Sequence, residues 1–274
     1  MGTTFRSEMA AVMKIGKYSV NAFSIFLAGT IFFLPLVAAA EFSFRKPGGK
    51  GHSFVNYTWL LQQDGFWPAL GASFRLAVLS GALNLILMVP TMVVLNLKAK
   101  RYKSIVDFIC ILPLIIPVVS LAIGAQVSMP EFLQNTDYEL VFFFVIVALP
   151  YTYRALDSAI SAVDIKVLVE ASRSLGASWF STIMKVIIPA IRTGIIGSLF
   201  LSFALAVGEF TLTSLLHWDT FPTWTVVAAQ QNILGAIAIS VFSFALAIFV
   251  LTSVGILSAR KKSLNLVIET EEVE

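Results

Sequence analysis

Side chains that could carry out chemistry are few and scattered in this chain. His52 and His217 are far apart in the sequence, and neither has a cysteine or another histidine at the spacing of a metal site. Cys110 is the only cysteine and lies in an apolar run, so it can form no disulfide within the chain. No G-x-x-x-x-G-K-[ST] phosphate loop is present. The residues therefore predict neither a metal enzyme nor an ATPase, and we expect no cofactor in this chain.

Glu209 is the ionisable side chain that most needs an explanation, because it lies inside an apolar run. An ionisable group at membrane depth costs roughly 2.5–3.5 kcal/mol on insertion scales and is a functional candidate. Glu209 could attract a cation in a translocation pathway, or it could pair with Arg75 and hold helices together. Asn84 and Arg75 are further candidates for the translocation pathway. For Asn84, a hydrogen bond between helices is the alternative.

The composition indicates a membrane protein. Hydrophobic residues make up 58% of the 274 residues and charged residues only 13%, and the mean hydropathy is +0.87. A soluble domain has roughly 25% charged residues. The net charge of +3 does not predict nucleic-acid binding, because the basic residues are clustered between apolar runs.

Six runs are long enough, or nearly long enough, for a helix to cross a bilayer about 30 Å thick. They are residues 18–40, 72–97, 105–127, 140–153, 193–216 and 236–258. The fourth is the shortest and is expected to continue toward Leu156. Pro113 and Pro117 are expected to kink the third run.

The distribution of basic residues predicts the orientation of the chain. One side of the predicted spans has 15 Lys and Arg residues and the other has 4. By the positive-inside rule, both termini are cytoplasmic. The expected segments are a cytoplasmic N-terminus (1–17), the first span (18–40), an extracytoplasmic loop (41–69), a membrane core (70–258) and a cytoplasmic tail (259–274).

The first apolar run has one alternative interpretation. Two preceding lysines and the triplet at residues 38–40 resemble a signal peptide with its cleavage site. We favour a retained anchor, because the run of about 23 residues exceeds the usual 7–15 of a signal peptide. In the loop that follows, residues 54–67 are expected to form an interfacial helix or lid.

The segment 157–189, between the fourth and fifth spans, is expected to fold as a helix–turn–helix. Asp164 can cap a helix whose apolar residues recur at helical spacing. Gly176 is expected to end that helix, since glycine adopts a positive φ readily. A second short amphipathic segment covers residues 179–185, and Pro189 is expected to end it by excluding the αR conformation from Ile188.

This segment resembles the cytoplasmic "EAA" loop of type I ABC importer permeases, E-A-A-x-x-x-G followed nine residues later by I-x-L-P. The matching residues are Glu170, Ala171, Ser172, Gly176, Val186, Ile187, Ile188 and Pro189. Ser172, Val186 and Ile188 depart mildly from the pattern. Residues 153–157, 112–117 and 205–210 also look like this family, and the resemblance covers roughly residues 72–258.

The resemblance implies an all-α inner-membrane permease subunit with six transmembrane helices and a coupling helix between the fourth and fifth. Glu170, Ala171, Ser172, Gly176 and Pro189 would form the surface that docks on an ABC ATPase subunit. A dimer of that subunit would bind ATP and Mg²⁺. The other implied partners are a second permease subunit, identical or homologous, and an extracytoplasmic substrate-binding protein.

The resemblance leans toward permeases for spermidine and putrescine, with those for ferric iron, sulfate, thiamine and phosphonates as alternatives. The Gly-Glu-Phe sequence at residues 208–210 also looks like permeases for sulfate and molybdate, so Glu209 is not a cation-specific ligand. A stand-alone channel or secondary transporter is an alternative of another class. It would have more polar residues in its spans and often inverted repeats, which we do not find.

Overall fold

The computed structural model describes residues 2–249, apart from residue 135, together with residue 252. The described chain is helical, with one isolated bridge between Arg45 and His52. A helix satisfies its backbone hydrogen bonds internally, which a segment in lipid requires. The predicted all-α fold class is confirmed. The predicted tail 259–274 and the last residues of the predicted sixth span lie outside the described residues.

The chain forms two compact units, of which the first contains residues 1–63 and 228–274. Its helices are α1 (Gly2–Ser43), α2 (Val55–Gln62) and the helix Ile233–Phe249. Helix α2 confirms that a helix forms within the predicted segment 54–67. The turn before it is fixed by the amide of Asn56, which donates to the carbonyl oxygens of Ser43 and Arg45, each at 2.8 Å.

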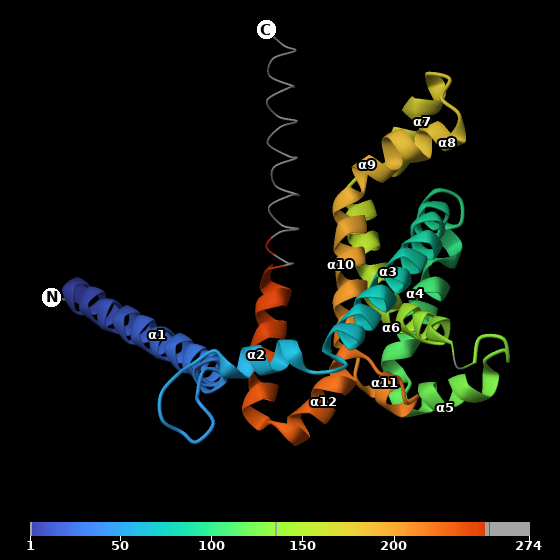
Figure 1. Cartoon of the computed structure of the whole chain (residues 1–274). Helices are drawn as coiled ribbons and strands as arrows, with labels where there is room; N and C mark the ends of the chain where they lie inside the picture. Colours follow the sequence, from blue (N-terminus) through green and yellow to red (C-terminus); the bar gives the residue numbers. More distant parts are fainter. Residues whose placement is uncertain (1, 135, 250–251, 253–274) are drawn as a thin grey trace, which may run out of the picture. The chain divides into compact units, whose positions relative to one another are not determined.

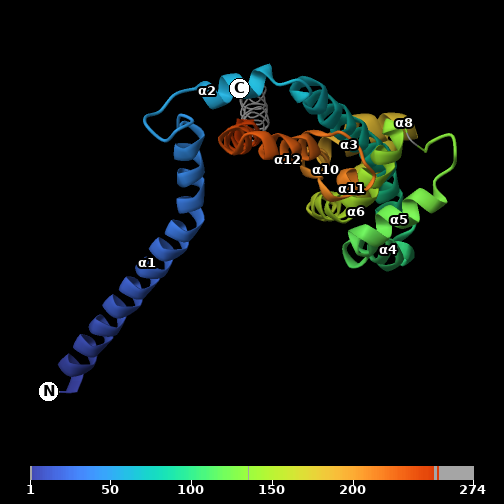
Figure 2. The same ribbon diagram turned by 60° about the horizontal axis from the view of Figure 1, so that its bottom comes forward.

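The second unit contains residues 64–227, and three long helices form its centre. Helices α3 (Phe66–Leu97), α6 (Asp137–Ser161) and α10 (Arg192–Gly208) pack against one another, as Figures 1 and 2 show. Helix α4 (Lys103–Ile115) follows α3 after the short η1 (Lys100–Tyr102) and packs against α6. Helix α12 (Phe221–Gln231) contains the boundary to the first unit.

Small side chains allow the three central helices to approach closely. The buried residues of α10 recur every fourth position, as Gly194, Ser198, Ser202 and Ala206. A Cβ at Gly194 would lie 3.0 Å from the carbonyl oxygen of Ala155 on α6 and would collide with another side chain there. Such small-residue stripes are typical of helix contacts in membranes, where close backbone packing replaces the hydrophobic effect as the driving force.

The predicted third span is broken in the structure. Helix α4 ends at Ile115, Ile116 is extended, and α5 (Val118–Ser128) begins after a bend of 101°. The break lies directly before Pro117, as expected from the steric conflict between a proline ring and a helical preceding residue. The other proline of the pair lies inside α4. The predicted kink is confirmed, but the span is not one continuous helix.

The predicted fifth span is also interrupted, which corrects the expectation of a helix across residues 193–216. Helix α10 ends at Gly208, Glu209 has an extended conformation with ψ 110°, and α11 (Thr211–Leu215) follows. Glu209 therefore lies at a break between helices and not within one.

Three described helices are long and apolar enough to cross a membrane: Asn21–Ser43, Phe66–Leu97 and Tyr138–Ser161. Two bent pairs, α4 with α5 and the segment Trp179–Ala190 with α10, bring the number to five if each pair is one span. The helix Ile233–Phe249 is shorter as far as the structure describes it. The predicted count of six spans therefore stays a prediction.

Candidate functional site

The predicted helix–turn–helix between α6 and α10 is present, and its first helix is α7 (Ile165–Ser174). Figure 1 shows α7 and α8 beyond the end of α10, to which α9 connects them. The Asp164 carboxylate accepts hydrogen bonds from the backbone N–H groups of Lys166 and Val167, at 3.2 and 3.3 Å. The predicted N-cap is thus confirmed, and it fixes where α7 begins.

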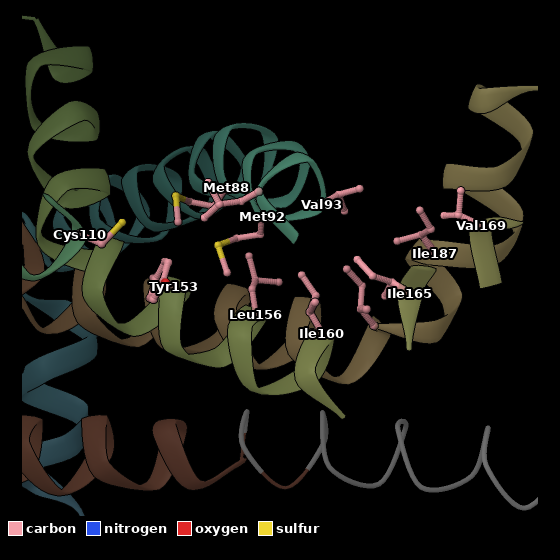
Figure 3. Close-up of a cluster of buried hydrophobic side chains, with 12 residues drawn as sticks. Met88, Met92, Val93, Cys110, Tyr153, Leu156, Ile160, Ile165, Val169 and Ile187 are labelled. Atoms are coloured by element: carbon pink, nitrogen blue, oxygen red, sulfur yellow. The ribbon is translucent and has the colours of Figure 1, made fainter. Parts of the chain in front are cut away.

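Helix α7 turns an apolar face inward and a mixed face outward. Ile165, Val169 and Ser172 are buried, whereas Glu170 and Ala171 are exposed. The two buried apolar side chains belong to a cluster that joins α7 to α3, α4 and α6, drawn in Figure 3. Its members are Met88, Met92, Val93, Leu95, Cys110, Tyr153, Leu156, Ile160, Ile165, Val169, Ile187 and Ile191. The segment is therefore anchored on the helical core rather than being a free loop.

Gly176 ends α7 in the predicted way. It has φ +82°, its N–H donates to the carbonyl of Arg173 at 3.0 Å, and the N–H of Ala177 donates to that of Ser172 at 3.2 Å. This is the Schellman arrangement, in which a left-handed residue satisfies the last carbonyls of a helix. A side chain with a Cβ is strained at this φ. Leu175, just before the glycine, has 89% of its surface exposed.

Helix α8 (Trp179–Thr182) follows the turn and is fixed against α7. Ser178 caps it by accepting from the N–H of Ser181 at 3.2 Å. The hydroxyls of Ser172 and Thr182 form a buried hydrogen bond of 3.0 Å between the two helices. This bond explains why a serine is accommodated at position 172, where the E-A-A-x-x-x-G pattern has alanine.

The structure contradicts the prediction that Pro189 ends this segment. Ile188 is in the αR conformation, and α9 (Ile188–Ala190) continues through the proline. The five residues that precede α9, Ile183–Ile187, form a π-helical turn, η2. The wider turn relieves the clash that a proline ring otherwise makes with a carbonyl of the preceding turn. The change of direction occurs instead at Ile191, with ψ 14°.

The outward side of the α7–α8 segment combines charge with exposed apolar groups. Glu170, Ala171 and Gly176 are exposed, whereas Ser172 is buried. Large apolar side chains on the same segment are also exposed, at 56% for Val167 and 72% for Phe180. Exposed apolar groups near charges are typical of a surface that another protein covers.

The carboxylate of Glu209 binds backbone rather than another side chain in the contacts that the structure gives for it. One oxygen accepts from the N–H of Leu212 at 2.8 Å, close to the start of α11. The backbone carbonyl of Glu209 accepts from the Thr213 hydroxyl at 2.9 Å. Glu209 therefore holds the break between α10 and α11. Arg75 is exposed on α3, and its predicted place in a pathway stays a prediction.

Asn84 lies at the contact of the three central helices. Its amide nitrogen donates to the hydroxyls of Thr152 on α6 and Ser202 on α10, at 3.0 and 3.1 Å. The two hydroxyls are 3.1 Å apart, and all three side chains are buried. The alternative of a hydrogen bond between helices is thus confirmed for Asn84. Its two partners were missed, because a lone Thr or Ser in an apolar run carries no distinctive signal.

Two ion pairs between α4 and α6 were also missed in the sequence. Lys103 binds Asp157 at 2.6 Å, and Arg154 binds Asp107 at 3.1 Å. Each helix contributes one cation and one anion. Among the residues that the structure describes, no group of three or more His, Cys, Asp or Glu side chains could hold a metal.

Similarity to known proteins covers most of the chain. Residues 65–262 match the family model described as "Binding-protein-dependent transport system inner membrane component". The probable transport system permease protein NifC of Clostridium pasteurianum is 28% identical over an alignment of 259 residues, which covers 86% of this chain and 86% of NifC. The spermidine/putrescine transport system permease protein PotC of Escherichia coli K12 is 24% identical over an alignment of 194 residues, which covers 69% of this chain and 73% of PotC.

A relative with another named substrate is the molybdate/tungstate transport system permease protein WtpB of Methanocaldococcus jannaschii. It is 25% identical over 197 residues, covering 64% of this chain and 79% of WtpB. A solved bacterial ABC transporter for import of the acidic polysaccharide alginate is similar in fold, with a TM-score of 0.64 and 17% identity. The match covers 86% of this chain and 94% of that one. The chain therefore belongs to the family of binding-protein-dependent transport system inner membrane components, the permease subunits of ABC importers, and is a translocator rather than an enzyme.

Proposed function

We propose that this permease subunit forms half of a translocation pathway and is driven through its α7–α8 segment. In this proposal α7 and the turn at Gly176 dock on a separate ABC ATPase subunit, which binds ATP and Mg²⁺. The observation that supports this proposal is the local structure of the segment. The Asp164 cap, the turn at Gly176 and the Ser172–Thr182 hydrogen bond make the segment rigid. A rigid, exposed element anchored on α3 and α6 can transmit force, which a flexible loop cannot.

The orientation follows from the same proposal. The α7–α8 segment, η1 and the first residues of α4 are cytoplasmic, because the ATPase works where ATP is. This agrees with the excess of Lys and Arg on that side. Both termini would then be cytoplasmic as well. The remaining partners are a second permease subunit and an extracytoplasmic substrate-binding protein, which delivers the solute.

We further propose spermidine or putrescine as the solute. One support is the similarity of the chain to PotC, which is named as a spermidine/putrescine permease. Another is charge: in the second unit, the predicted outer loops and the outer ends of the predicted spans contain one basic residue, Arg75, and six acidic ones, namely Asp64, Glu131, Asp137, Glu139, Glu209 and Asp219, of which Glu139 is buried. A surface of one sign concentrates solutes of the opposite sign near it. An oxyanion such as molybdate is the second candidate, because WtpB is named for it.

The assembly is tested by mass spectrometry of what co-purifies with the tagged chain from gently solubilised native membranes. We expect a P-loop ATPase, a second permease subunit or further copies of this chain, and a secreted binding protein. Recovery of this chain alone, repeated after cross-linking, would contradict the proposal.

The solute is tested with the same strain and a strain that lacks the permease. Radiolabelled spermidine uptake should depend on the permease, and molybdate uptake should not. The reverse result would replace the polyamine by an oxyanion without changing the proposed mechanism.

A further inference from the structure

Trp179, the first residue of α8, is in contact with two cationic side chains. The ammonium of Lys98 is 4.7 Å from the centre of the indole ring, and the guanidinium carbon of Arg173 is 5.5 Å from it. Both distances are within the range of attraction between a cation and an aromatic face. Trp179 retains 40% exposure, so the contact lies at the surface of the unit.

The two cations belong to different parts of the fold. Arg173 is on α7 and is held by a 2.8 Å hydrogen bond from its guanidinium to the carbonyl of Ala177, within the same turn. Lys98 is the C-cap of α3, and its N–H donates to the carbonyl of Val94. The Arg173 contact is therefore internal to the α7–α8 segment, whereas the Lys98 contact joins that segment to the end of α3.

Lys98 has no competing carboxylate in the part of the chain that the structure describes. On α4 and α6, Asp157 pairs with Lys103 and Asp107 with Arg154. The indole is thus the partner that the structure gives for the exposed Lys98 ammonium.

The contact has a mechanical consequence. The apolar packing of Val169 in the cluster shared with α3 holds the two elements together, but it is non-directional. A cation over a ring is directional and resists sliding. Further along α3 from Lys98, Asn84 binds Thr152 and Ser202 on the two other central helices.

We propose that Lys98 and Trp179 form a positioning contact that transmits movement of the α7–α8 segment to α3. This inference rests on the proposed docking of the segment on an ATPase. Neither residue would touch the solute. Their loss would leave the segment able to dock and would weaken its connection to α3, of which the shared apolar cluster would remain.

The test is hydrogen–deuterium exchange on the complex purified from native membranes, with and without ATP and vanadate. In the unaltered protein, trapping should change exchange both in residues 164–182 and at the end of α3, residues 90–99. In Lys98→Met, the change in residues 164–182 should remain and the change in residues 90–99 should be clearly reduced, since the apolar cluster is then the remaining link. Lys98→Arg should restore it.

Lys100→Met is the matched control, because Lys100 is exposed two residues away and has no aromatic ring contact in the described structure. It should behave as the unaltered protein. The double variant Lys98→Met with Trp179→Leu should lose no more of the response at residues 90–99 than Trp179→Leu alone, which removes both the Lys98 and the Arg173 contact.

An unchanged response at residues 90–99 in Lys98→Met would overturn the inference and leave the proposed docking intact. A lack of nucleotide response at residues 164–182 of the unaltered protein would overturn the docking, and this inference with it.

Discussion

The hydroxyls of Ser172 and Thr182 lie 3.0 Å apart and are buried, so that one hydrogen bond joins the two arms of the α7–α8 segment. Each hydroxyl is the only polar group of its side chain. Removing one leaves the other without that partner in a buried place, at a cost of about 1–3 kcal/mol, whereas removing both is nearly neutral.

We therefore expect Ser172→Ala and Thr182→Val each to increase hydrogen exchange in residues 164–182 at least several-fold. The double variant should return close to the unaltered level. The measurement is exchange of the purified protein in detergent. A double variant with the summed effect of the two single variants would show that the hydroxyls act independently.

Gly194 sets the distance between α10 and α6. A Cβ at this position would meet Ala159 and the carbonyl of Ala155, which is backbone and cannot move aside. Gly194→Ala should lower stability by about 1–3 kcal/mol, as overpacking does. Gly197→Ala is the control, since a Cβ there meets nothing within 4 Å. The midpoint of thermal unfolding should fall for the first variant only, and equal midpoints would contradict the close packing.

The pair Lys103–Asp157 connects α4 to α6, with 29% and 21% of the two side chains exposed. Asp157→Lys places two cations together and should cost roughly 1–3 kcal/mol, between the values for exposed and buried pairs. Adding Lys103→Asp to the same chain should recover most of the loss. Thermal unfolding at low and high salt measures this, and no recovery in the double variant would argue against a direct pair.

Glu209 holds the start of α11 through an oxygen that accepts from the N–H of Leu212. Glu209→Gln keeps an acceptor oxygen, whereas Glu209→Ala removes it at a cost of about 1 kcal/mol, as for a lost helix cap. We expect solute uptake by the Gln variant to stay within about twofold of normal, and the Ala variant to be less stable. A large loss of uptake with unchanged stability in the Gln variant would instead make the charge part of the pathway.

Local rules were sufficient where neighbouring residues decide the structure. Asp164 as a cap and Gly176 as a stop were both predicted, because each acts on backbone groups within a few residues. Pro117 likewise interrupts its helix as expected. The prediction for Pro189 was wrong, because a π-helical turn before it absorbs the steric conflict, and apolar composition does not reveal such a turn.

Contacts between distant residues were not predictable in the same way. Thr152 and Ser202 are 68 and 118 residues from Asn84, and only the packing of three helices brings the side chains together. The extended conformation of Glu209 was missed because apolar residues continue on both sides of it. Hydropathy shows that a segment is in the membrane, but not where its helix breaks.

The docking of the α7–α8 segment on an ATPase is tested most directly by photo-crosslinking in intact cells. A photoreactive amino acid at Leu175, which is 89% exposed beside Gly176, should give an adduct identified as a P-loop ATPase. The same group at Val127 on α5, which is 81% exposed, should not. We expect an ATPase adduct from the photoreactive group at position 175 and none from the group at position 127. The absence of any ATPase adduct from Leu175, with the protein present in the membrane, would contradict the proposed mechanism.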